Sequence, residues 1–81
     1  MNKNEETKIR WHCRRGMLEL DKMLHAFFDK EFQHLSEEEK LIFITLLEHT
    51  DQELYQWLIG MNKPSDSQLL RMIQKIQQAN Q

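Results

Sequence analysis

Little in this sequence interrupts a helix or cross-links a fold. Its 81 residues include one cysteine, one proline and two glycines, so the chain cannot form an internal disulfide and has few helix-breaking positions. No apolar run approaches the roughly 20 residues that cross a bilayer, and no alternating stretch of β-branched or aromatic residues indicates a strand. These absences predict a single all-α domain that inserts no segment into a membrane.

Signals for export are also missing. Residues 1–8 have no apolar stretch of the kind found in secretion signals, and Glu5 and Glu6 argue against an acid-poor transit peptide. A lone cysteine suits a reducing compartment. We therefore expect a cytoplasmic protein of bacterial origin.

The spacing of apolar residues predicts a compact bundle of five short helices, with a core between about residues 9 and 77. The expected helices span about residues 4–14, 17–32, 36–49, 50–60 and 65–76. Capping boxes begin the third and fourth helices, Ser36 with Glu39 and Thr50 with Glu53, and Ser65 is the expected cap of the fifth. The first residues and the Gln-rich end of the chain are expected to fray.

Three local features lead to further structural expectations. The run from Leu41 to Leu47 is apolar at six of seven positions, which predicts a helix that the other helices enclose on most sides. Gly16 interrupts the helical pattern, and this suits a tight turn in which a Cβ would clash with a close neighbour. Gly60 is placed to end the fourth helix in a left-handed conformation.

The residues that could carry catalysis are poorly arranged for it. The four histidines are scattered through the chain without the close spacing of a zinc site. Cys13 has only the adjacent His12 as a nearby base in sequence, and adjacent residues on a helix point in different directions. Gly16 and Gly60 stand alone, so no glycine-rich phosphate loop is present. We expect a protein that is not an enzyme and binds no metal.

A basic run is the most unusual feature of the charge distribution. Residues 8–15 contain four basic and no acidic residues, although the chain as a whole has a net charge of −2. Such a run can be a solvated helix face or a nucleic-acid contact, but only one aromatic residue accompanies it. Arginine forks beside carboxylates can also recognise a partner protein. Locally, Glu19 could simply pair with Arg15 four residues earlier.

Two motifs in this chain resemble those of a known family. The string Arg15-Gly16-Met17-Leu18-Glu19-Leu20-Asp21 is followed by Asp51-x-x-Leu54-x-x-Trp57-Leu58-x-Gly60 and then by Pro64. In this combination and spacing they are similar to the succinate dehydrogenase assembly factor 2 family, called SdhE in bacteria. The resemblance covers the chain from about Arg10 to Ile76. Gln52 stands where the family often has proline, which is dispensable at a helix start.

The resemblance implies a five-helix domain that promotes covalent attachment of FAD to the flavoprotein subunit of succinate dehydrogenase and, in bacteria, also of fumarate reductase. It implies a chaperone-like monomer with no tightly bound cofactor, because the FAD is attached to the partner, and no nucleic-acid partner. Partner contact is then expected at Arg10, Arg14, Arg15, Gly16, Met17, Glu19, Asp21, Asp51 and Trp57. The alternative is a small helical regulatory protein, antitoxin-like or nucleic-acid-binding.

Overall fold

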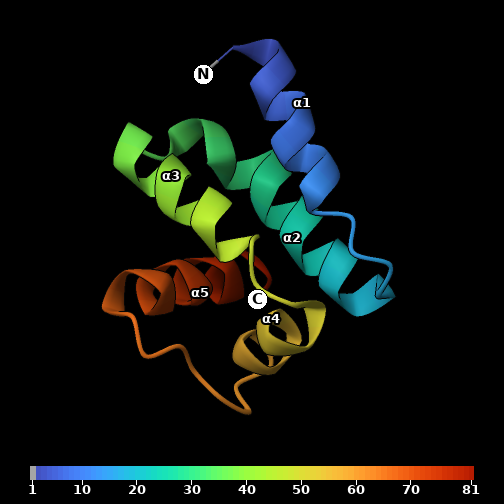
Figure 1. Ribbon diagram of the computed structural model, residues 1–81, viewed down its shortest axis with the longest axis vertical. Coiled ribbons are helices and arrows are strands. Elements are labelled where there is room, and N and C mark those ends of the chain that lie inside the picture. Colours follow the sequence, from blue (N-terminus) through green and yellow to red (C-terminus); the bar gives the residue numbers. More distant parts are fainter. Residues whose placement is uncertain (1) are drawn as a thin grey trace.

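The structure is a computed structural model that describes residues 2–81, and the helices predicted from the sequence are all present in it (Figure 1). Their bounds are Lys3–His12 for α1, Leu18–Glu31 for α2, Glu37–Leu46 for α3, Asp51–Leu58 for α4 and Ser67–Ala79 for α5, with a 3-10 turn, η1, at Phe32–His34. No strand occurs among residues 2–81. The predicted all-α bundle of five helices is therefore confirmed.

The helix caps follow the sequence prediction at two of three starts. Ser36 and Thr50 each form a complete capping box with the glutamate three residues later. The prediction of Ser65 as the cap of α5 is wrong. The carboxylate of Asp66 instead accepts hydrogen bonds from the amides of Gln68 and Leu69, at 2.8 and 3.1 Å. Serine and aspartate are comparable helix N-caps, and the folded backbone brings the Asp66 carboxylate rather than the Ser65 hydroxyl to these two amides.

Helix α5 lies at the centre of the packing. It contacts α2, α3 and α4, and Figure 1 shows it crossing beneath α3. An aromatic cluster fills the adjoining core, where the ring of Phe43 lies 5.4 Å from that of Phe27 and 5.9 Å from that of Phe32. Residues of every α-helix contribute to one continuous core.

The expectation that α3 is enclosed on most sides is wrong. Leu41 is 60% exposed, and Ile42 and Ile44 are only half-buried. Phe43 and Leu46 alone within the helix carry fully buried apolar side chains. The apolar run makes α3 hydrophobic all round, but only one side of the helix packs against a partner helix.

Side chains at the Gln-rich end of the chain form hydrogen bonds to two other helices. Helix α5 continues to Ala79, and the side-chain amide of Gln77 donates to the carbonyls of Trp57 and Leu58 at 3.3 and 3.2 Å. The side-chain amide of Asn80 donates to the carbonyl of Met23 at 3.1 Å. These side-chain hydrogen bonds connect the end of α5 to α4 and α2. The fraying expected of the Gln-rich end stays a prediction.

Candidate partner-binding site at the turn between α1 and α2

The turn between α1 and α2 begins at a buried cysteine. Cys13 is fully buried, and its thiol donates to the carbonyl of Ile9 at 3.5 Å. Burial raises the pKa of this thiol to about 12. A thiol that stays protonated and out of contact with solvent is a poor nucleophile. Cys13 therefore anchors the end of α1 and offers no catalytic group.

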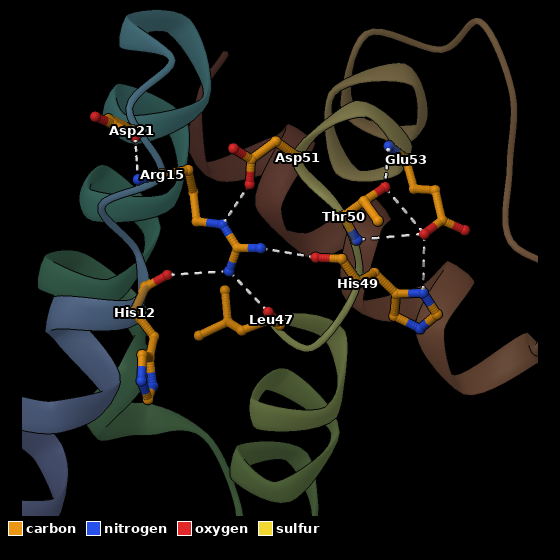
Figure 2. A network of polar contacts seen from close by, with 8 residues as sticks. All are labelled: His12, Arg15, Asp21, Leu47, His49, Thr50, Asp51 and Glu53. Carbon is orange, nitrogen blue, oxygen red and sulfur yellow. Dashed lines mark hydrogen bonds and ion pairs between the residues drawn. The ribbon is translucent and has the colours of Figure 1, made fainter.

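Two residues further on, the side chain of Arg15 enters the molecule and ends between α1, α3 and α4 (Figure 2). Its Nε donates to Oδ1 of Asp51 at 2.7 Å. Its Nη1 donates to the carbonyls of His12 and Leu47 at 3.2 and 2.7 Å, and its Nη2 donates to the carbonyl of His49 at 2.7 Å. The guanidinium group thus has four acceptors within the chain.

These acceptors sit at the ends of helices, which makes the arrangement electrostatically favourable. His12 is the last residue of α1, Leu47 caps the end of α3, and Asp51 is the first residue of α4. The carbonyls at helix ends lack partners inside the helix and carry the negative end of the helix dipole. A guanidinium group satisfies two such ends at once, while Asp51 lies at the positive end of α4.

Helix α2 joins the same network through the backbone of Arg15. The amide of Arg15 donates to Oδ1 of Asp21 at 2.6 Å. Helix α2 has no side-chain cap of its own at Met17. The carboxylate in its first turn instead reaches back to the preceding turn, so that Arg15 connects the ends of α1, α2, α3 and α4.

The neighbours of Arg15 face solvent. Glu19 is exposed, and its side chain forms no hydrogen bond or ion pair with any residue from 2 to 81, so the local Arg15–Glu19 pair considered from the sequence is wrong. Arg14 is exposed and stacks over the ring of Trp11, 5.7 Å from its centroid. Leu18 is 70% exposed. The turn therefore has an inner residue, Arg15, between outer residues of mixed chemistry.

Gly16 is left-handed, with a φ of 86°, and exposed. No atom of the residues described lies within 4 Å of the position that a Cβ would take. The expected clash with a close neighbour within the chain is wrong, and backbone conformation is the reason for glycine here. The open space leaves room for another molecule to approach the backbone.

Ion pairs within the chain neutralise part of the charge of the basic run at residues 8–15. Arg10 pairs with Asp29 at 3.1 Å, and the hydrogen bond between them lowers the pKa of Asp29 and raises that of Arg10. Arg15 pairs with Asp51. Among the described residues, only Lys8 and Arg14 of the four cations have no acidic partner. Two separate cations make a weak footprint for nucleic acid, whose binding depends on the number of phosphates neutralised.

The other residues expected at the site divide between core and surface. Trp57 is 8% exposed and packs edge-on against His49, with 5.0 Å between ring centroids, so it belongs to the core rather than to an exposed contact surface. Met17 is half-buried and packs against the core. Leu18 lies within the motif but is not among the contact residues expected from the sequence, and its exposure is visible only in the structure. The carbonyls of Leu47 and His49 were not expected at the site, because no side-chain pattern marks a backbone acceptor.

Neither a metal centre nor a membrane span emerges from the geometry. Over residues 2–81, no three histidine, cysteine or acidic side chains are grouped so that they could hold a metal ion. In the same range, none of the helices has the length and apolar character needed to cross a membrane.

Comparison with known proteins gives consistent matches across the chain. Residues 7–80 match a family described as "Flavinator of succinate dehydrogenase". The FAD assembly factor SdhE of Coxiella burnetii is 51% identical over 71 residues, covering 88% of this chain and 87% of that protein. The FAD assembly factor SdhE of Haemophilus influenzae is 46% identical over 77 residues, covering 95% of this chain and 91% of that protein.

A solved structure agrees with the fold. The solution structure of a UPF0350 protein is similar with a TM-score of 0.80 and 40% sequence identity, covering 99% of this chain and 86% of that one. The fold is that of a small helical domain, and the relatives that match over most of the chain are named as assembly factors rather than as enzymes. The chain belongs to the SdhE family of FAD assembly factors, the family described as the flavinator of succinate dehydrogenase.

Proposed function

We propose that this protein binds the flavoprotein subunit of succinate dehydrogenase and promotes the covalent attachment of FAD to it, acting as a monomer in the bacterial cytoplasm. The flavoprotein subunit of fumarate reductase is a second client in this proposal. Support comes from the family and from one observation, the Arg15 network. That network connects the turn from Arg14 to Glu19 to three other helices and leaves the outer residues of the turn exposed to solvent.

The chemistry we propose for the factor is positioning. The flavin becomes bonded to a histidine of the flavoprotein, and the flavin supplies the oxidising chemistry. The factor binds the unassembled flavoprotein and holds the flavin and the acceptor histidine in a reactive arrangement, which lowers the barrier by orientation rather than by proton transfer. A buried, protonated Cys13 fits a factor that contributes no reacting group.

The docking surface in this proposal consists of Arg14, Gly16, Leu18 and Glu19, all of which are exposed. Leu18 provides apolar area, Arg14 and Glu19 provide charges of opposite sign, and Gly16 lets a partner backbone approach. The factor carries no tightly bound cofactor, because FAD is held by the flavoprotein and this chain has no glycine-rich phosphate loop.

The test is co-expression of the flavoprotein with the factor, followed by in-gel fluorescence of covalent flavin. Wild type is compared with Gly16→Arg and with Gly60→Arg as a matched control. Both glycines are left-handed, with φ values of 86° and 83°, and neither has an atom within 4 Å of the place where a Cβ would stand, so both variants carry similar backbone strain.

We expect Gly60→Arg to retain flavinylation and Gly16→Arg to lose most of it. The reason is that only the arginine at position 16 stands on the proposed docking surface. Equal flavinylation with both variants would show that this surface is not the contact. No increase of covalent flavin with wild type would remove the proposed function as a whole.

A further inference from the structure

We infer that Arg15 is a positioning residue, which holds the docking surface in its binding geometry without touching the flavoprotein. This inference rests on the proposed function. It assigns different roles to two residues of one short motif: Glu19 faces the partner, whereas Arg15 faces the interior. The carboxylates of Asp21 and Asp51 belong with Arg15 because both are bound to it.

The first argument is that internal contacts occupy four of the five N–H donors of the guanidinium group. An arginine side chain has five N–H donors. Four donor–acceptor contacts of 2.7 to 3.2 Å connect Nε, Nη1 and Nη2 to acceptors within the chain. The side chain of Arg15 is 16% exposed. One N–H of Nη2 has no acceptor among residues 2–81, so a single hydrogen bond to a partner would leave the network intact. A bidentate contact with a partner carboxylate needs two N–H groups and would break one of the four internal contacts, which leaves a carbonyl or the Asp51 carboxylate without its donor.

The second argument is the distance in sequence that the network covers. The carbonyls of Leu47 and His49 lie 32 and 34 residues from Arg15, and Asp51 lies 36 residues away. Figure 2 shows the side chain reaching from the turn between α1 and α2 to the turn between α3 and α4. Loss of the Arg15 side chain would remove this hydrogen-bonded link between the start of α4 and the first turn of α2, which carries Leu18 and Glu19.

The third argument is that a lysine at position 15 could not form the same network of hydrogen bonds. The ammonium group of lysine is a point charge, whereas the planar fork of arginine reaches acceptors in several directions at once. Arg15→Lys therefore keeps the charge and releases most of the connections. This variant separates a requirement for positive charge at the partner from a requirement for a fixed turn.

The experiment measures the rate of covalent flavin formation on purified flavoprotein with FAD while the concentration of the factor is varied. The variants are Arg15→Lys, Asp51→Ala and the double variant, with Gln77→Ala as a destabilised control far from Arg15 in sequence. Asp51→Ala leaves three of the four contacts of the guanidinium group, so we expect it to fold. Circular dichroism checks the helix content of each.

We expect Arg15→Lys to raise the half-saturating concentration about tenfold and to leave the maximal rate unchanged. That is the effect of a turn that occupies the docking geometry about one-tenth of the time. Asp51→Ala should raise the half-saturating concentration by a smaller factor, and the double variant should resemble Arg15→Lys, because both changes break one network. Gln77→Ala should change neither quantity.

Three outcomes would overturn the inference. Effects that multiply in the double variant would mean that Arg15 and Asp51 contact the partner independently. A lowered maximal rate with Arg15→Lys would place Arg15 at the reacting groups. An equal rise with Gln77→Ala would mean that general destabilisation is the cause. If wild type itself forms no covalent flavin at any concentration, the proposed function has failed, which is a different result from any of these.

A second measurement needs no variant and covers the case in which Arg15→Lys fails to fold. Phenylglyoxal modifies exposed arginines, and tandem mass spectrometry distinguishes Arg14 from Arg15. We expect Arg14 to react about tenfold faster than Arg15 in the free factor, because Arg15 reacts only after local opening. Addition of flavoprotein should slow Arg14 more than Arg15. Stronger protection of Arg15 would make it a contact residue and overturn the inference.

Discussion

Two turns of this protein share a left-handed glycine and differ in how they are held. The turn between α1 and α2 contains Gly16, and the longer connection between α4 and α5 begins at Gly60. The first is fixed by a single cation whose acceptors are at the ends of α1, α3 and α4. The second is flanked by the neutral amide of Gln77, which donates to the end of α4, and by the Asp66 cap of α5.

The difference shows that similar local backbone can have unlike connections to the rest of a molecule. Glycine gives both turns the same conformational freedom, and the surrounding bonds decide how rigid each becomes. Hydrogen bonds from a charged donor are stronger than those of a neutral amide. A surface that must be ready for a partner gains affinity from being fixed in advance. The turn at Gly16 has that property.

The largest expected effect comes from removing the charged network. Arg15→Ala should lower the free energy of unfolding by about 3 kcal/mol, because it leaves Asp51 and the carbonyls of Leu47 and His49 without their donor. Urea unfolding followed by circular dichroism measures this loss. A second readout is Cys13, which adjoins the turn and should be alkylated faster in the variant. A loss below about 1 kcal/mol would place Arg15 with ordinary surface ion pairs.

The two glycines test whether the same substitution has the same effect on stability in both turns. Gly16→Ala and Gly60→Ala should each cost about 1 to 2 kcal/mol of stability, because a Cβ is unfavourable in the left-handed region and neither site offers compensating contacts. Thermal unfolding of the two variants measures both costs. A much larger cost at Gly16 would mean that strain there is transmitted through the Arg15 network rather than remaining local.

Gln77→Ala should have a smaller effect. Its side-chain amide donates two hydrogen bonds of 3.3 and 3.2 Å to carbonyls at the end of α4, and the loss of neutral bonds of this kind costs about 1 kcal/mol. Hydrogen exchange of backbone amides should then increase around residues 57–62 and remain unchanged around residues 14–19. Increased exchange in both regions would show that the two turns are not independent.

Acid should produce the smallest effect, through the capping boxes. The backbone amide of Thr50 lowers the pKa of Glu53, and Lys75 followed by the backbone of Ser36 lowers that of Glu39. A carboxylate with a lowered pKa in the folded state stabilises the protein above its unfolded pKa, near 4.3, and this contribution disappears as pH falls through the folded pKa.

Stability should therefore decline as the pH is lowered below about 4.3, the ordinary pKa of glutamate. Two variants should each flatten this decline. They are Glu53→Gln, next to the Arg15 network, and Glu39→Gln, at the opposite end of α3. Unfolding by urea at a series of pH values is the measurement. Curves parallel to that of wild type in both variants would contradict the assignment of these two carboxylates.

The features that can be predicted well from the sequence are local. The helices, the capping boxes at Ser36 and Thr50 and the left-handed Gly60 depend on residues within a few positions of one another. The predicted cap of α5 is off by one residue because Ser65 and Asp66 are both good capping residues and only the folded backbone chooses between them.

The features that escape sequence reasoning are non-local. Leu41 and Phe43 are both apolar, and only the packing of α3 against the other elements determines that the first is exposed and the second buried. The role of Arg15 is hidden for a further reason. Most of its acceptors are carbonyl groups, which every residue has, so no side-chain pattern marks them. The motif identifies the exposed residues of the candidate site, but it does not reveal that Arg15 binds acceptors inside the chain.

The carbonyl acceptors of Arg15 also have a consequence for tolerance to mutation. Because Leu47 and His49 are bound through their backbone, the contact does not depend on which side chains stand at these positions. The turn between α3 and α4 can therefore accept substitutions at Glu48, whose side chain is exposed, and retain its link to Arg15. On the other side of the contact only one residue type has the required fork. A deep mutational scan should then show an intolerant position at Arg15 and a permissive one at Glu48.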